Sequence, residues 1–171
     1  MDRYLQELHD AIASVTSGMN TEQLTAHPEG KWCAAEVLEH LYLTYRGTVK
    51  GCERCLEHGK TLSRTPRFPD WMRTTVVVRF GYMPPGRKAP AVSVPRGMPA
   101  EEVVKAMGPE ILAMDDLLTR CEARFGQSTR ILDHPVLGPL TAAQWRKFHW
   151  VHGWHHVKQL RNLCSAYPQA K

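Results

Sequence analysis

Four long segments of the chain carry apolar residues at the three- and four-residue spacing of an α-helix, and this periodicity constrains the fold more than any other feature. The segments span residues 2–15, 32–58, 100–125 and 141–167. Short links join the first pair and the last pair, and one long crossover joins the second segment to the third. The pattern predicts an all-α fold, a four-helix bundle, in which residues 1–171 form a single domain.

Residues at the ends of these segments support the predicted boundaries. Thr141 and Gln144 have the spacing of a capping box, and Cys33 with Glu36 resembles one in which a thiol replaces the usual hydroxyl. Gly126 suits the position just past the end of the third helix. We therefore expect helices that begin and end close to these residues.

The crossover, residues 60–98, is rich in proline and contains a β-branched run at residues 74–78. That run has the propensity of a strand, but its length and amphipathicity also allow a short helix, which we favour. The remainder is expected to be an extended loop. Loops of this length in compact domains are usually functional or disordered.

The crossover also holds the densest set of basic residues in a chain whose formal net charge is +5. This set consists of Arg64, Arg67, Arg73, Arg79, Arg87, Lys88 and Arg96. It could attract an anionic small molecule, or it could be an ordinary solvated surface. We expect no nucleic-acid partner, because no nucleic-acid-binding motif accompanies the basic charge.

No apolar run approaches the roughly 20 residues needed to cross a bilayer, and the first residues lack the apolar core of a secretory signal. We therefore expect a cytoplasmic protein without a membrane partner. The number of cysteines is odd, which argues against a disulfide framework. Cys52 and Cys55 form a C-x-x-C motif, but no second such motif accompanies them, so zinc or redox chemistry there is the weaker interpretation.

Residues 149–156 hold four of the nine histidines. These four are His149, His152, His155 and His156. A helix turns by about 100° per residue, so His152 and His156 lie on one face together with His149, whereas His155 projects about 100° away. Two imidazoles one turn apart can bind the same metal ion.

His40, in the second predicted helix, lies on a stripe with Val37 and Thr44 and is expected to face the core. Imidazoles from two neighbouring helices could then converge, and three protein ligands leave one coordination position open, as in catalytic zinc sites. The alternative is that His40, His152 and His156 are core residues with separate hydrogen-bond partners.

Two segments resemble the metal-binding segments of DinB-like (YfiT-like) proteins: GKWCAAEVLEHL at residues 30–41 and LTAAQWRKFHWVHGWHHVKQL at residues 140–160. The second contains the family's motif H-x-x-H-H followed by a glutamine. The sequence HPVLGPLTAAQW further resembles an uncharacterised branch of that family. Mapped onto this chain, the resemblance implies that His40, His152 and His156 bind the metal. Cys33 departs from the family pattern, where serine or threonine is expected.

The resemblance also implies a four-helix bundle, a divalent metal such as zinc or nickel, and a possible homodimer. Characterised relatives include S-transferases and an isomerase that use a low-molecular-weight thiol. We therefore hypothesise a metal-dependent thiol S-transferase or hydrolase that acts on a small-molecule substrate. The basic crossover could hold the carboxylates of the thiol, and His149 and His155 could support the metal site or transfer protons. The alternative function is a metal-stabilised binding or stress-response module without turnover.

Overall fold

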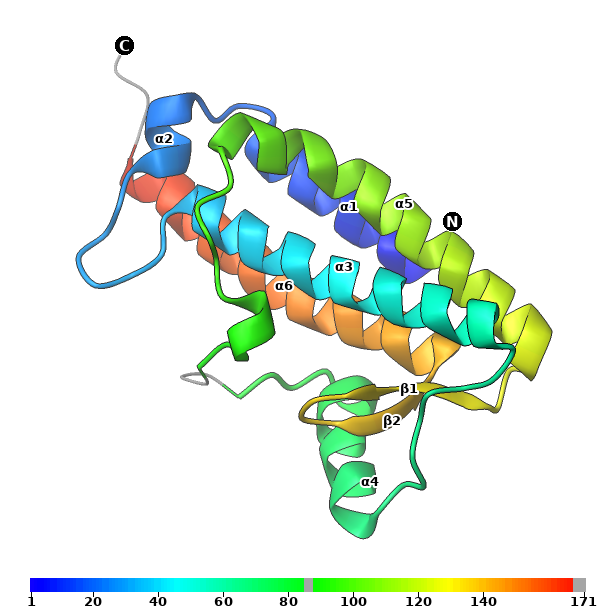
Figure 1. Cartoon of the computed structure of the whole chain (residues 1–171). Coiled ribbons are helices and arrows are strands. Elements are labelled where there is room, and N and C mark those ends of the chain that lie inside the picture. The colour runs from blue at the N-terminus through cyan, green and yellow to red at the C-terminus, as the bar shows by residue number, and fades with distance from the viewer. Residues whose placement is uncertain (85–87, 168–171) are drawn as a thin grey trace.

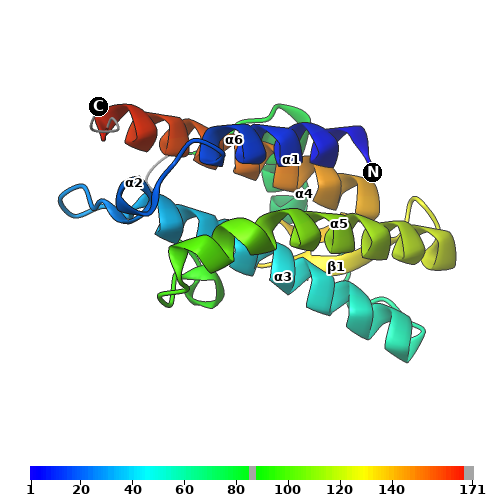
Figure 2. The same cartoon turned by 90° about the horizontal axis from the view of Figure 1, so that it is seen from above.

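Long helices dominate the computed structural model of the chain, which describes residues 1–84 and 88–167. They are α1 (Arg3–Thr16), α3 (Ala34–His58), α5 (Ala100–Phe125) and α6 (Ala142–Ala166). These helices run side by side, with α3 packed against α5 and α1 against α6, and α3 also contacts α6 (Figures 1 and 2). The prediction of a mostly helical chain is thus confirmed, and the four helices begin and end close to the predicted residues.

Side-chain caps explain where two of these helices begin. At the start of α6, the Thr141 amide donates to the Gln144 side chain at 3.0 Å, and the Gln144 amide donates to the Thr141 hydroxyl at 3.2 Å. At the start of α3, the Cys33 amide donates to the Glu36 carboxylate at 2.9 Å. Amides in the first turn of a helix have no partner within the helix, so such acceptors favour initiation at these points.

A small antiparallel sheet corrects the all-α expectation. Its two strands are β1 (Arg130–His134) and β2 (Gly138–Thr141). They form a hairpin between α5 and α6. The His134 imidazole holds the turn, because its Nδ1 accepts hydrogen bonds from the amides of Val136 and Leu137 at 3.1 and 3.0 Å. Strands this short have too few residues to produce a recognisable alternating pattern.

Short helical elements occupy the connections. They are α2 (Thr21–Thr25), α4 (Phe68–Thr74), the π-helix η1 (Thr75–Arg79) and the 3₁₀ helix η2 (Ala91–Ser93). Residues 74–78 are therefore helical, as the sequence favoured, and not a strand. The α4 helix contacts the β2 strand, whereas η2 lies against α3. The η1 helix contacts α6, so the crossover touches the long helices through both η1 and η2.

Apolar side chains from all four long helices fill the core. Among the fully buried ones are Leu5, Leu8, Leu38, Leu41, Ile111, Leu118 and Leu160. The thiols of Cys52 and Cys55 belong to this core, since both residues are fully buried. Cys121 of α5 donates a weak hydrogen bond to the Cys52 carbonyl at 3.8 Å. These contacts support a packing role for the C-x-x-C motif.

Candidate metal centre

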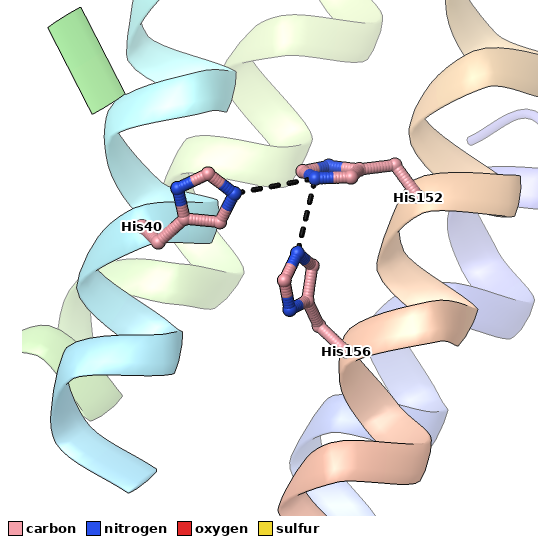
Figure 3. Close-up of side chains that lie close together, drawn as sticks. All are labelled: His40, His152 and His156. Atoms are coloured by element: carbon pink, nitrogen blue, oxygen red, sulfur yellow. Dashed lines mark hydrogen bonds between the residues drawn. The ribbon is translucent and has the colours of Figure 1, made fainter. Parts of the chain in front are cut away.

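Three histidine side chains converge between α3 and α6 (Figure 3). His40 comes from α3, whereas His152 and His156 come from α6. Nε2 of His152 lies 3.2 Å from Nε2 of His40 and 3.0 Å from Nε2 of His156. The structure therefore brings together the three residues that the sequence selects.

Helix geometry and helix packing each contribute part of this cluster. Residues four apart in a helix lie one turn apart on the same face, which places His152 and His156 together. His40 is buried on α3, where its imidazole lies against Ser93 of η2 and His152 of α6. The pair on α6 is thus a local feature, but the third imidazole depends on the packing of two distant segments.

Hydrogen bonds from outside the cluster orient two of the three imidazoles. His40 Nδ1 lies 2.7 Å from the Ser93 carbonyl oxygen, and His156 Nδ1 lies 2.7 Å from the Gln159 side-chain oxygen. Because such oxygens only accept, each Nδ1 carries the proton and donates it. The lone pair of each Nε2 is then directed into the cluster, where it is available to a metal.

Glu39 keeps the Ser93 carbonyl within reach of His40. Its buried carboxylate accepts hydrogen bonds from three successive amides, at 2.8, 3.0 and 2.9 Å. These amides belong to Arg96, Gly97 and Met98. The clamp fixes the end of the crossover against α3. Sequence reasoning missed both Glu39 and Ser93, because their partners lie 57 and 53 positions away and leave no local pattern.

The surroundings of His152 fit a bound metal. Its Nδ1 is buried without a hydrogen-bond partner among the described residues, and its ring stacks on Phe148. Both neighbouring Nε2 atoms present lone pairs, so one proton on His152 Nε2 cannot satisfy both of them fully. Two nitrogens bonded to one tetrahedral zinc ion at about 2.0–2.1 Å lie roughly 3.4 Å apart. The observed separations of 3.0 and 3.2 Å are close to that value.

Burial keeps the three imidazoles neutral. It lowers the pKa of His40 and of His152, and it lowers the pKa of His156 to about 3. Repulsion from neighbouring histidines acts in the same direction, for example from His40 on His156. A neutral imidazole is the form that binds a metal. The cluster is therefore already in the protonation state that coordination needs.

Comparison with known proteins identifies the family of this chain. A family model described as "Protein of unknown function (DUF1569)" matches residues 1–163. The chain belongs to the DUF1569 family. The match includes His40, His152 and His156. Neither a curated protein nor a solved structure matches this chain.

The other two histidines of α6 in this DUF1569 chain have different surroundings. His155 packs its ring against His156, and the Gln159 amide nitrogen lies 3.5 Å from His155 Nε2. Gln159 therefore bridges His155 and His156. His149 is fully buried, and its Nε2 lies 3.0 Å from the Thr48 hydroxyl. Its Nε2 contact is with the core rather than with the three-histidine cluster.

Two cavities lie along α6. One, of about 400 Å³, is lined by aromatic, methionine and basic side chains. Its lining includes Tyr82, Met83, Trp150, Trp154, His155 and Lys158. The other, of about 690 Å³, lies between α1 and α6 and includes Arg161 and Cys164. The first borders the metal centre through His155, but neither cavity is lined by the three clustered histidines.

Basic residues of the crossover make contacts away from the cluster. Arg64 forms a two-pronged ion pair with Asp70 at 2.6 and 2.9 Å, and Arg73 donates to the Val136 carbonyl of the hairpin at 3.2 Å. Arg87 lies outside the described residues. The two arginines with known partners therefore tie the crossover to itself and to the hairpin. They do not support the expectation that these two hold a thiol carboxylate.

A second group of possible metal ligands surrounds Cys33. The ligand atoms of His27, Cys33 and Glu36 lie within 4.8 Å of one another. However, Glu36 already accepts from the Cys33 amide, and His27 is exposed. Burial raises the pKa of the Cys33 thiol, which opposes formation of a thiolate. The three-histidine cluster is the better candidate centre.

Proposed function

We propose that this DUF1569 chain is a divalent-metal-binding protein and that His40, His152 and His156 hold the metal. The Nε2 atoms of His156 and His40 lie 3.0 and 3.2 Å from that of His152, and this convergence carries the proposal. Zinc and nickel suit a site made of imidazoles. The same three positions are the ones that the resemblance to DinB-like proteins selects, and the side-by-side long helices are compatible with the four-helix bundle of that family.

We further propose that the centre serves a metal-dependent enzyme of the thiol S-transferase or hydrolase type. The chemistry that a divalent metal supplies at an open three-histidine centre is Lewis acidity, which lowers the pKa of a thiol or of water and produces a nucleophile near neutral pH. The chain contributes orientation: Ser93 and Gln159 hold the Nδ1 protons of His40 and His156 away from the cluster. The Phe148 ring covers one face of His152 and excludes water there.

The cavity beside His155 is the candidate place for a small-molecule substrate. Trp150 and Trp154 supply apolar walls, and Lys158 supplies a positive charge. Such a mixture suits an organic molecule that carries an anionic group. His155 lines this cavity and touches His156 through its ring and through Gln159, so it links the cavity to the centre.

A second candidate function is a metal-stabilised module without turnover. One observation favours it: His40 and His156 are buried, and the two cavities are lined by other residues. A centre that small molecules do not reach would contribute to folding stability instead of catalysis. Metal exchange separates the two candidates, since a substrate-accessible centre loses its metal quickly to a small chelator, whereas an enclosed one loses it only on unfolding.

Elemental analysis of the protein without an affinity tag tests the metal proposal. We expect about one divalent ion per chain, because one centre is formed. His152→Ala and His156→Ala should lose the ion, whereas the neighbouring variant His155→Ala should retain it. A wild-type protein that neither contains a metal nor takes up added zinc or nickel would refute the proposal. Loss of binding in His155→Ala would instead show that the ligand set is misassigned.

A further inference from the structure

The α4 helix presents its polar residues to the rest of the protein. Asp70 is buried and forms the ion pair with Arg64. Thr74 donates from its hydroxyl to the Leu137 carbonyl at 3.2 Å. Gly138 lies so close to Asp70 that a Cβ there would overlap the carboxylate. Polar contacts with the hairpin therefore dock this helix, whereas an ordinary surface helix docks through its apolar face.

Exposed apolar side chains lie on α4, on η1 and directly after η1. Phe68, Trp71 and Phe80 have exposed fractions of 72%, 63% and 73%. Met72 and Val76 are exposed on the same segment. The rings of Phe68 and Trp71 stack with centroids 6.2 Å apart, so they form one continuous surface. Soluble proteins rarely leave a contiguous apolar patch of this kind without a partner.

The charge around this apolar ridge is positive. Arg67, Arg73 and Arg79 are exposed on the segment. The one acidic residue among residues 64–84 is Asp70, and its charge is balanced by Arg64. An anionic partner would therefore be attracted to the rim of the apolar surface. A second copy of this chain, docked through the same surface on both sides, would bring like charges together.

The shape of the ridge selects among anionic partners. The α4 helix stands away from the long helices, beyond the hairpin (Figure 1). Neither cavity described above is lined by residues of α4, and side chains as exposed as those of Phe68 and Trp71 project into solvent instead of lining a groove. A projecting apolar ridge with aromatic side chains and a basic rim has the properties of a helix that lies in a membrane interface.

We propose that α4 and η1 bind the surface of a membrane that contains anionic phospholipids. Phe68, Trp71 and Phe80 enter the boundary between headgroups and acyl chains, and the arginines contact lipid phosphates. This is peripheral attachment. In the described part of the chain no helix is both long and apolar enough to span a membrane, in line with the sequence. A surface-bound helix needs no spanning segment, and the sequence expectation of no membrane partner rested on the lack of one.

Vesicle flotation with the full-length protein tests this proposal. Vesicles of phosphatidylcholine mixed with phosphatidylglycerol are compared with vesicles of phosphatidylcholine alone. We expect binding to the mixed vesicles, weaker binding to the neutral ones, and a decrease as salt is raised. The double variant Phe68→Ser/Trp71→Ser should bind roughly 100-fold more weakly, because it removes the two largest inserted side chains. Arg67→Gln/Arg79→Gln should bind about 30-fold more weakly.

Leu112→Ser is the matched control, since Leu112 of α5 is 51% exposed but lies outside the ridge. It should bind the mixed vesicles as the wild type does. The two double variants leave Asp70, Arg64 and Thr74 intact, so their melting temperatures should match that of the wild type. Absence of wild-type binding to the mixed vesicles would overturn the proposal, as would undiminished binding by Phe68→Ser/Trp71→Ser. A dimer in light scattering that this variant abolishes, without vesicle binding, would assign the ridge to a second copy.

Discussion

At the scale of single residues, the centre depends on groups that do not belong to it. Ser93 and Gln159 determine which nitrogen of His40 and of His156 carries the proton. Ser93 acts through its backbone carbonyl, which no side-chain substitution removes. Substitution of Glu39 can test this support instead, because its carboxylate holds the segment that positions the Ser93 carbonyl.

We predict that Glu39→Gln lowers metal affinity by about tenfold or more, the usual effect of losing support for a metal-binding histidine. The glutamine has one acceptor oxygen instead of two, and its NH₂ group faces backbone amides that need acceptors. Calorimetric titration with zinc measures the change. Glu102→Gln, on the exposed face of α5, is the control and should bind like the wild type. Equal affinity in Glu39→Gln would show that the clamp has no effect on His40.

The buried His134 side chain is expected to make the stability of the fold depend on pH, separately from the metal centre. Burial lowers its pKa to about 4, whereas an unfolded histidine has a pKa of about 6.5. Above about pH 6.5 both states are neutral, so stability does not change with pH. Between about 6.5 and 4 only the unfolded state binds the proton, and stability falls by about 1.4 kcal/mol per pH unit.

His134→Asn should therefore flatten the pH profile of stability. The asparagine oxygen can accept the two amide hydrogen bonds of Val136 and Leu137 but does not titrate. Urea unfolding at pH 7 and pH 4.5 measures the loss of stability in each protein. We expect the variant to lose about 2–3 kcal/mol less than the wild type over this range. Identical losses would mean that His134 titrates normally in the folded protein.

At the scale of elements, close approach of α1 and α6 requires a glycine. A Cβ at Gly153 would overlap the methyl groups of Leu8. Leu8 is fully buried and cannot move away without leaving a void elsewhere in the core. The helix that carries the metal-binding pair is therefore seated against α1 at this position, one residue after His152.

Gly153→Ala should destabilise the protein by about 1–3 kcal/mol, the usual range for overpacking a core. Gly47 is the matched control, because it also lies within a long helix but has no atom near the position of a Cβ. Gly47→Ala should stabilise the protein by about 0.5–1 kcal/mol through helix propensity. Thermal melts of both variants measure these effects. Stabilisation by both substitutions would refute the close packing of α1 and α6.

At the scale of the whole molecule, the metal is expected to add stability to a fold that does not require it. A chain of 171 residues can bury roughly 70% of its unfolded surface. A chelator should therefore lower the melting temperature at neutral pH without unfolding the protein, and added metal should restore it. Burial lowers the pKa of all three imidazoles, that of His156 to about 3, so protons should not displace the metal and the stabilisation should persist between about pH 7 and 5.

Melting curves with and without chelator at the two pH values measure this prediction. Complete unfolding by the chelator at neutral pH would identify a structural metal and favour the module without turnover. Melting that does not respond to metal at any pH would identify the three histidines as ordinary core residues.

Local spacing in the sequence was sufficient to predict the four long helices and the pairing of His152 with His156. Helical periodicity and side-chain caps act over a few residues, so they are visible in the sequence. The inward direction of His40 followed from the same periodicity. The capping box of Thr141 and Gln144 marked the start of α6 correctly.

Only the tertiary structure decided the features that depend on distant partners. The hairpin that contains His134, the clamp by Glu39 and the Ser93 contact with His40 join residues or strands whose pairing no local pattern encodes. The direction of α4 is the clearest case. Its sequence has apolar and polar faces, but the Arg64–Asp70 ion pair and the hairpin turn the polar face inward. Which face of a short helix is buried depends on what it packs against, and that partner lies elsewhere in the chain.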